Sequence, residues 1–313
     1  MSGTDINGGG TTMRVFVTGA SGFIGSAVVS ELLGAGHAVI GLARSDESAE
    51  RLAAAGAEVQ RGSLEDLDAL RAGARDADGV IHLAYIHDFS NLGVSAAVDE
   101  RAIATFGDEL AGSGRPFVIA SGLGLVARLD AGEDVLGRDV PGGHRGRAAY
   151  ETVALAERGV RSAVVGLAPS VHGEGDKAFV PAIIDAARRN GVSGYVGDGT
   201  NRWSALHRLD AARLFRMALE SAPAGALLHA TEGEGIEFRR IAEVIGAHLD
   251  LPVESVPPEH FGWLAAFAGA DLTGPYKPAL GWEPTHPGLL EDLAQGHYFT
   301  ARASSIRAGS SRA

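Results

Sequence analysis

The sequence predicts an α/β fold, a doubly wound parallel sheet with a small C-terminal α/β domain beside it. Two observations support this prediction. From residue 13 to about residue 170, short apolar runs that suit buried strands alternate with runs that suit helices. In addition, Gly19, Gly22 and Gly25 follow one another at three-residue spacing between the first strand and the first helix. A strand, a glycine turn and a helix in this order are typical of a dinucleotide-binding unit.

The glycine turn follows a strand predicted over residues 14–17 and precedes a helix predicted over residues 26–33. The first glycine lets the chain turn sharply, the second leaves room for a pyrophosphate, and the third lets the helix pack on the sheet. The helix N-terminus adds free N–H groups and a partial positive charge, which suit phosphate. We therefore predict that the turn and the first helical residues bind the cofactor, namely Gly19, Ser21, Gly22, Phe23, Ile24 and Gly25.

The composition argues against several other classes of protein. The 313 residues allow a large core, and a formal net charge of −12 makes a nucleic-acid partner unlikely on electrostatic grounds. There is no cysteine, and the scattered histidines lack the spacing of metal ligands, so we expect no metal. No apolar run approaches the ~18 residues of a membrane span. We expect a disordered leader over residues 1–12, a disordered tail over residues 301–313 and a cytoplasmic location.

The second strand is predicted over residues 37–43, and Arg44 lies just past its end. At this point of a dinucleotide-binding unit, an acidic residue holds the ribose hydroxyls of NAD, whereas an arginine suits the extra phosphate of NADP. Such a charge-assisted contact contributes roughly 1.5–3 kcal/mol. Asp46 and Glu47 follow closely and favour the opposite choice. We predict NADP as the cofactor, with NAD as the alternative.

The next elements continue the alternation of strand and helix. The predicted helices cover residues 50–55, 66–72 and 96–111, and the predicted strands cover residues 58–61, 79–84 and 116–120. Parallel strands present their carboxyl ends at one edge of the sheet, so the residues that follow them meet the cofactor. We expect Ser63 and Leu64 beside the adenine, and Tyr85, His87 and Asp88 at the mouth of the crevice.

Residues 123–146 are rich in glycine and charge without a clear period, and we expect an irregular loop over the site. Further helices are predicted over residues 147–158, 179–190, 211–219 and 238–249, and further strands over residues 161–167, 194–199 and 226–230. We expect His82 to be a hydrogen-bonded core residue. His207 and Asp210 are expected to fix the start of a helix, with Asp210 as its N-cap.

Five segments resemble the extended short-chain dehydrogenases/reductases, the NAD(P)-dependent epimerase/dehydratase family. These segments are residues 18–25 (TGASGFIG), 81–84 (IHLA), 167–173 (LAPSVHG), 203–212 and 280–284 (LGWEP). The resemblance covers roughly residues 13–299. It implies a Rossmann-type NAD(P)-binding domain, mainly residues 13–170, and a substrate-binding region over residues 171–300 that is interleaved with it.

The resemblance also implies roles for single residues. It places Ser121 at the catalytic Ser/Thr position of the family, where it also contacts the cofactor. It places five further residues beside the cofactor, namely Leu83, Ala84, Pro169, Ser170 and Val171. The family often forms dimers through the two long helices of the nucleotide domain, here around residues 96–111 and 147–158, so a homodimer is expected.

The family's catalytic Tyr-x-x-x-Lys pair is missing, because neither Lys177 nor Lys277 has a tyrosine four residues before it. In this respect the chain resembles the atypical subgroup of the superfamily. Two alignments are open. One puts Tyr150 at the tyrosine position with an alanine in place of lysine. The other preserves the helix length better and puts Arg147 at the lysine position and Gly143 at the tyrosine position. Arg147 would then bind the nicotinamide ribose, but an arginine does not act as a base.

A carbonyl reduction needs a hydrogen-bond donor for the developing alkoxide, and Ser121 is the best-placed one. The proton donors to consider are Tyr85, His87, His144 and Tyr150. We predict an NADP-dependent oxidoreductase that transfers a hydride between nicotinamide and a small, fairly apolar ketone or aldehyde. Two alternatives remain: a redox-neutral epimerase, dehydratase or isomerase with bound NAD(P), and a non-catalytic NADP-binding sensor.

Overall fold

The computed structural model describes residues 11–87, 91–136 and 143–300. Its largest element is a seven-stranded sheet with the strand order β11-β6-β5-β4-β1-β2-β3, and every neighbouring pair is parallel. The strands are β1 (Arg14–Thr18), β2 (Ala38–Ala43), β3 (Glu58–Arg61), β4 (Gly79–His82), β5 (Pro116–Gly122), β6 (Arg161–Leu167) and β11 (Ala226–Ala230). This sheet confirms the predicted Rossmann-type α/β fold.

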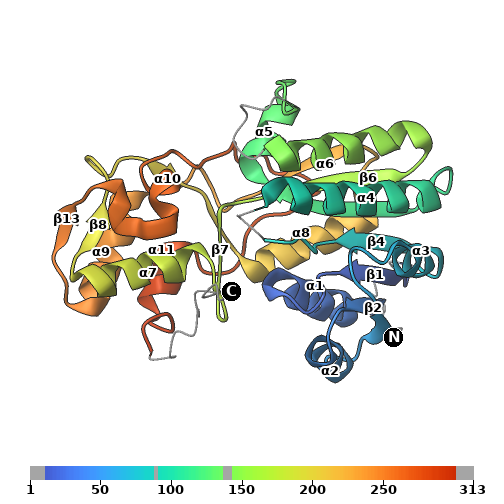
Figure 1. Ribbon diagram of the computed structural model, residues 1–313, viewed down its shortest axis with the longest axis horizontal. Helices are drawn as coiled ribbons and strands as arrows, with labels where there is room; N and C mark the ends of the chain where they lie inside the picture. Colours follow the sequence, from blue (N-terminus) through green and yellow to red (C-terminus); the bar gives the residue numbers. More distant parts are fainter. Residues whose placement is uncertain (1–10, 88–90, 137–142, 301–313) are drawn as a thin grey trace, which may run out of the picture.

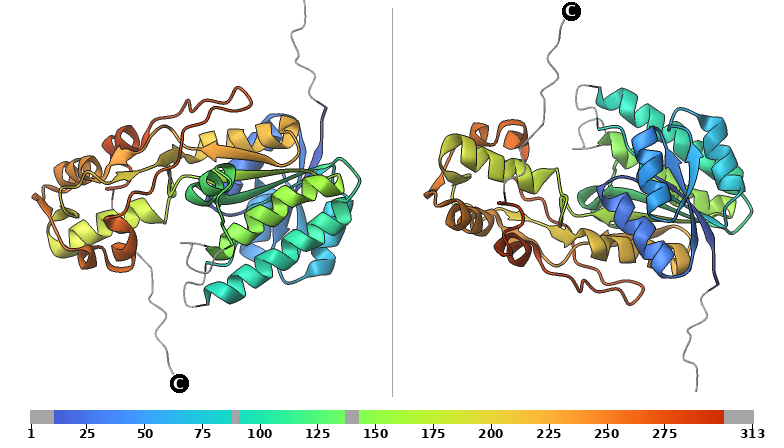
Figure 2. Two further views of the ribbon diagram at one scale, coloured as in Figure 1. Left: turned by 90° about the horizontal axis from the view of Figure 1, so that it is seen from above. Right: turned by 90° about the horizontal axis from the view of Figure 1, so that it is seen from below.

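Helices cover both faces of the sheet (Figures 1 and 2). One face carries α1 (Phe23–Gly34) and α8 (Arg208–Ser221), and the other carries α3 (Leu67–Arg75), α4 (Leu92–Leu110) and α6 (Gly143–Ala154). The helix α2 (Asp46–Ala54) packs beside β2 and β3. Residues alternate between the two faces along β1. Val15 and Val17 join the core under α1, whereas Phe16 joins the core under α4.

The strand order reverses beside β1. From β1 the chain moves outward to β2 and β3, and it then returns to place β4 on the other side of β1. In open α/β sheets, ligands bind outside the carboxyl ends of the strands at such a switch point.

The chain after β6 builds a second lobe, which lies to the left in Figure 1. Its helices are α7 (Phe179–Asn190), η2 (Pro258–Leu264), α9 (Phe238–Leu249), α10 (Ala265–Ala268) and α11 (Leu289–Ala294). Three two-stranded sheets pair β7 (Ser170–His172) with β10 (Ala205–His207), β8 (Ser193–Tyr195) with β13 (Val253–Ser255), and β9 (Arg202–Trp203) with β12 (Ile236–Glu237). The lobe has its own buried cluster around Trp203 and Phe238, while α8 and β11 return to the large sheet.

The structure corrects the loop expected over residues 123–146. Leu123–Asp130 forms the helix α5, and α6 begins at Gly143, with a 3-10 turn η1 (Leu155–Arg158) after it. The helix α5 forms because Leu123 and Val126 are buried against β6. Gly166 makes this packing close, since a Cβ there would lie 2.7 Å from Val126 Cβ.

Two histidines behave as predicted, and one aspartate does not. His82 is buried and hydrogen-bonded with Thr18 Oγ1 at 2.7 Å and with Asp99 at 3.0 Å. His207 is the N-cap of α8, and its Nδ1 accepts a hydrogen bond from the Leu209 N–H. The prediction of Asp210 as N-cap is wrong, because α8 begins three residues earlier than the predicted helix, at Arg208. Asp210 instead accepts hydrogen bonds from the backbone of the segment 285–286.

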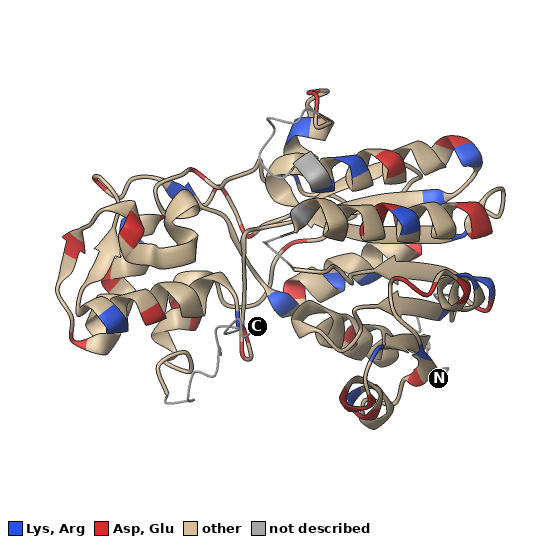
Figure 3. Cartoon of the chain, in the orientation of Figure 1, with Lys and Arg blue, Asp and Glu red and all other residues tan. Residues whose placement is uncertain are grey.

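Acidic and basic residues are interspersed over both lobes (Figure 3). In the part of the chain that the structure describes, no helix combines the length and the apolar character needed to cross a membrane. The predicted tail and Asp88 lie outside the described residues, as does most of the predicted leader.

Candidate functional site

A cleft of about 660 Å³ lies at the carboxyl ends of β1, β2, β4 and β5, beside the switch point of the sheet. Its size is within the range of small-molecule and cofactor sites. The lining residues come from segments far apart in the sequence. They are Gly19, Ser21, Gly22, Phe23, Ile24, Gly25, Leu42, Arg44, Ser48, Gly62, Ser63, Leu64, Glu65, Leu83, Ala84, Tyr85, Ile86, His87, Ala120, Arg145 and Leu167.

The glycine turn shapes the floor of the cleft. Gly19 has a φ of 67°, and a Cβ there would lie 2.7 Å from Ala84 N, so the ends of β1 and β4 meet only because Gly19 lacks a side chain. A Cβ on Gly25 would lie 2.0 Å from Gly19 O, which fixes how closely α1 approaches the turn. The first turn of α1 holds no acidic residue, and no side chain caps it. Its free N–H groups therefore suit a pyrophosphate.

Arg44 lies at the β2 end of the cleft and is exposed. Within the described residues it forms no hydrogen bond or ion pair. The two acidic residues that follow it are both paired: Asp46 with Arg61, and Glu47 with Arg51 at 3.5 Å. Arg44 is thus the charged side chain at this end that remains available for an anion.

The opposite end of the cleft is lined by Tyr85, His87 and Arg145, together with the apolar Ala120 and Leu167. The Arg145 guanidinium lies over the Tyr85 ring, 4.2 Å from its centroid, and donates a hydrogen bond to Ala120 O at 3.2 Å. Burial raises the pKa of Tyr85, and the positive charge of Arg145 offsets part of this rise. Burial also lowers the pKa of His87, and Arg145 lowers it further. At neutral pH, Tyr85 therefore carries its proton and His87 is neutral.

Ser121 follows the cleft-lining residue Ala120 on β5 but is itself only 3% exposed and does not line the cleft. Its hydroxyl is buried and has no hydrogen-bond partner among the described residues. The hydroxyls of Ser162, Ser170 and Ser204 are buried without a described partner as well, so Ser121 differs from them in following the cleft-lining Ala120.

Several predicted site residues are not brought to the cleft. Arg147 lies on the outer face of α6, where it pairs with Glu100 and Glu151, each at 3.6 Å. Tyr150 is 49% exposed on the same helix. Residues three apart lie on the same face of a helix, so Arg147 and Tyr150 both point away from the sheet when the opposite face of α6 packs on it. Pro169, Ser170 and Val171 do not line the cleft, and the side chain of His144 lies outside the described residues.

Sequence reasoning missed Arg145, which is the cationic side chain at the Tyr85 end of the cleft. The signal that could have found it was faint. Two arginines, Arg145 and Arg147, lie close together at the start of α6, and only the direction in which the helix packs distinguishes them. Ser48 and Leu167 were also missed as lining residues. Among the described residues, no group of three or more acidic or histidine side chains is arranged to hold a metal ion.

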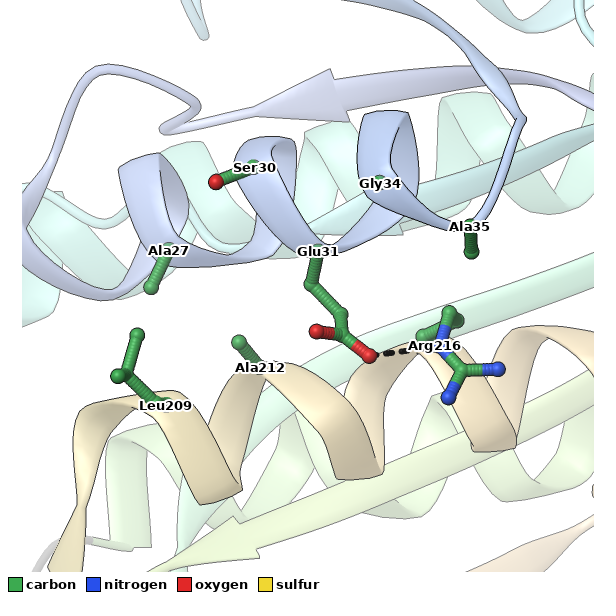
Figure 4. A pocket seen from close by; sticks show the side chains of 8 residues that line it. All are labelled: Ala27, Ser30, Glu31, Gly34, Ala35, Leu209, Ala212 and Arg216. Atoms are coloured by element: carbon green, nitrogen blue, oxygen red, sulfur yellow. Dashed lines mark hydrogen bonds and ion pairs between the residues drawn. The ribbon is translucent and has the colours of Figure 1, made fainter. Parts of the chain in front are cut away.

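A second hollow, of about 480 Å³, lies between α1 and α8 (Figure 4). Small residues line it, and a hydrogen-bonded ion pair of 2.7 Å between Glu31 and Arg216 crosses it. This hollow is not lined by the glycine turn or by any of the predicted catalytic residues. Its ion pair joins the two helices.

The chain was compared with protein families and with curated proteins. Residues 15–99 match a family model described as the NAD dependent epimerase/dehydratase family. An uncharacterized protein of Schizosaccharomyces pombe is 45% identical over 302 residues, which cover 92% of this chain and all of the relative. An uncharacterized protein of Saccharomyces cerevisiae is 46% identical over 299 residues, covering 90% of this chain and 98% of the relative. A 4-hydroxy-2-methyl-3-oxo-4-farnesyl-3,4-dihydroquinoline-1-oxide ketoreductase of Stigmatella aurantiaca is 28% identical over 245 residues, covering 72% and 70%.

Solved structures resemble most of the chain. The UDP-glucose 4-epimerase of Thermotoga maritima, solved with UDP-glucose, has a TM-score of 0.66 at 22% identity and covers 92% of this chain and 98% of its own. The dTDP-glucose 4,6-dehydratase of Bacillus anthracis, solved in complex with NAD, has a TM-score of 0.67 at 15% identity and covers 91% and 96%. At these identities, the likeness establishes a common fold and not a common substrate.

Proposed function

Because this chain belongs to the NAD dependent epimerase/dehydratase family, we propose that it is an NADP-dependent oxidoreductase. It transfers a hydride between the nicotinamide and a small, fairly apolar ketone or aldehyde. The observation that supports this most is the cleft itself, which runs from an unpaired Arg44 past the free N-terminus of α1 to Tyr85 and Arg145. The ketoreductase among the relatives is consistent with carbonyl reduction.

The residues of the cleft divide the binding of the cofactor between them. Arg44 and the nearby Ser48 hydroxyl hold the extra phosphate of NADP, and the N–H groups at the start of α1 hold the pyrophosphate. Ser63 and Leu64 lie against the adenine, and Ala84 lies towards the other end of the cleft. When bound, the cofactor supplies or receives the hydride.

The substrate binds at the other end of the cleft. Ala120 and Leu167 give an apolar wall, which favours an uncharged substrate. Tyr85, His87 and Arg145 are the polar groups that face the same space. Ser121 assists as a hydrogen-bond donor to the carbonyl oxygen, a role supported by its unpartnered hydroxyl and its position next to the cleft-lining Ala120.

The test is NADPH oxidation across a panel of aldehydes and ketones, followed optically, with a parallel series in NADH. We expect turnover that prefers NADPH, and at least a tenfold lower kcat in Ser121→Ala. We also expect Ser121→Ala to be more stable than the wild type, with a higher free energy of unfolding. The reason is that an unsatisfied buried hydroxyl costs about 1–3 kcal/mol.

Ser162→Ala is the matched control. The Ser162 hydroxyl is also buried without a partner, but it lies near the amino end of β6, away from the cleft. It should gain stability without losing turnover. NADPH binding without oxidation by any carbonyl of the panel would contradict the proposed reduction. Equal kcat values in the two serine variants would remove Ser121 from the reaction.

A further inference from the structure

We propose that Tyr85 and Arg145 together replace the missing Tyr-x-x-x-Lys pair of the family. Tyr85 Oη donates the proton to the carbonyl oxygen of the substrate, and the Arg145 guanidinium stabilises the tyrosinate that remains. This inference rests on the proposed carbonyl reduction and names the residues that carry its proton transfer.

The two side chains meet although they come from distant segments. Tyr85 follows β4 and Arg145 lies in α6, yet the guanidinium carbon is 4.2 Å from the centroid of the tyrosine ring. Both residues line the same cleft. Arg145 is held in place by its hydrogen bond to Ala120 O, at the β5 edge of that cleft. The pair is therefore positioned between the ends of β4 and β5, next to the apolar wall that we assign to the substrate.

Among the residues that the structure describes, no carboxylate pairs with Arg145. Among the described residues its contacts are the Tyr85 ring and Ala120 O, and its Nε is buried without a hydrogen-bond partner. Arg147, two residues further along, pairs with Glu100 and Glu151 instead. The guanidinium lies over the Tyr85 phenol, and its positive charge favours the ionised form of that phenol.

The other titratable groups around Tyr85 do not compete for its proton. Asp99 raises the pKa of Tyr85 through its negative charge, but the Asp99 carboxylate is hydrogen-bonded with His82 Nε2 at 3.0 Å. The His87 ring lies 5.2 Å from the Tyr85 ring, and burial and Arg145 lower the pKa of His87. Tyr85 is thus the acid of this group at neutral pH, and His87 beside it is neutral.

The step balances as follows. The carbonyl carbon accepts the hydride of the reduced nicotinamide, and the π electron pair of the C=O bond moves onto the oxygen. That oxygen takes the proton of Tyr85 Oη, so the products are the alcohol, the oxidised nicotinamide and the Tyr85 tyrosinate. Arg145 stabilises the tyrosinate until a proton from solvent restores the phenol. A general acid positioned in this way contributes a factor of about 10²–10⁴ to the rate.

The kinetic experiment compares two pairs of variants on the carbonyl that the wild-type protein reduces fastest. Tyr85→Phe should lower kcat at least a hundredfold while the Kd for NADPH, measured by fluorescence, changes less than about threefold. Tyr150→Phe, on the exposed face of α6, should leave both unchanged. Arg145→Ala should lower kcat and move the basic limb of the pH profile upward, and Arg145→Lys should restore part of the rate. Arg147→Ala is the control for the loss of an arginine from this helix.

A second readout does not depend on turnover. The ultraviolet absorbance of tyrosinate, taken as the difference between the wild type and Tyr85→Phe, reports the titration of Tyr85 alone. Arg145→Ala should shift this titration to higher pH, because the guanidinium favours the ionised phenol, whereas Arg147→Ala should not. The inference about Tyr85 and Arg145 would be overturned by an unshifted titration in Arg145→Ala, or by a Tyr85→Phe variant with the wild-type kcat. If the wild-type protein reduces a carbonyl in that case, the proposed function stands without a role for the Tyr85–Arg145 pair. If the titration shifts as expected but no carbonyl is reduced, the proposed function fails instead.

Discussion

At the scale of single residues, Arg44 differs from its neighbours because it has no hydrogen-bond or ion-pair partner in the described part of the chain. Asp46 and Glu47 carry the opposite charge close to it, yet both are paired, with Arg61 and Arg51. An anion at the end of β2 therefore meets one unpaired cation, and the two carboxylates are partly screened by their partners. This arrangement supports our proposal that the cofactor is NADP, whose extra phosphate Arg44 would bind.

Arg44→Ala is expected to weaken NADPH binding by about ten- to a hundredfold, the loss of one charge-assisted contact of roughly 1.5–3 kcal/mol. NADH binding should change little, because NADH brings no phosphate to this position. Fluorescence titration with both cofactors measures the two Kd values. Arg71→Ala, which breaks a surface pair with Asp68 on α3, is the control and should affect neither cofactor. A parallel loss for NADH would mean that Arg44 binds a part common to both cofactors.

At the scale of elements, the cleft depends on how closely α1 approaches the end of β1. The helix is 12 residues long and holds two glycines in opposite surroundings. A Cβ on Gly25 would lie 2.0 Å from Gly19 O, whereas a Cβ on Gly34, at the last residue of α1, would meet nothing within 4 Å. The first glycine is required by packing, and the second is not.

Gly25→Ala should push the start of α1 away from the turn. We expect a loss of about 1–3 kcal/mol in the free energy of unfolding, as for other overpacked sites, and a loss of NADPH affinity of at least tenfold. Gly34→Ala should be neutral or stabilise by up to about 1 kcal/mol, because alanine is the better helix former. Chemical unfolding measures the free energy of unfolding of both variants, and titration with NADPH measures their Kd values. Similar behaviour of the two variants would show that the close approach of α1 is not what builds the phosphate site.

At the scale of the whole molecule, polar side chains hold α11 and the chain beyond it to β7 and the segment that follows β7. His172 is fully buried and hydrogen-bonded with Asp292 of α11 at 2.7 Å. Asp176 receives a hydrogen bond from the Tyr298 hydroxyl at 3.2 Å. Burial raises the pKa of Asp176 from 3.8 to about 6, more than its hydrogen bonds lower it. The contribution of Asp176 to the stability of the folded protein therefore depends on pH.

The sign follows from the raised pKa of Asp176. The folded protein holds this proton more tightly than the unfolded chain, so its stabilising contribution is complete below about pH 4 and is lost as the pH rises through about 6. In Asp176→Asn, the free energy of unfolding should lack this part of the pH dependence, about 2–3 kcal/mol. Chemical unfolding between pH 4 and pH 8 measures it. Asp185→Asn, which breaks an exposed pair with Arg188, should keep the wild-type slope. An unchanged slope in Asp176→Asn would assign the pH dependence to other groups.

The sequence by itself determined the Rossmann-type sheet and the lining of the cleft near β1. Both features depend on segments that are consecutive in the sequence. A strand, a glycine turn and a helix that follow one another along the chain are also neighbours in the folded protein. Gly19, Gly25 and Arg44 could therefore be predicted from their positions relative to strand ends, and all three line the cleft. The helix α5 was missed because it has only eight residues and lies in a stretch rich in glycine and charge, and because its stability comes from packing on β6.

Only the tertiary structure decided which side chains meet at the other end of the cleft. Arg145 and Arg147 are about 200° apart around α6, since a helix turns about 100° per residue, so only one of them can face the sheet. The direction in which α6 packs selects Arg145 for the cleft and leaves Arg147 to surface carboxylates. Tyr85 meets Arg145 across 60 positions of the chain, and no local pattern encodes such a contact. The packing of the helices on the sheet determines it.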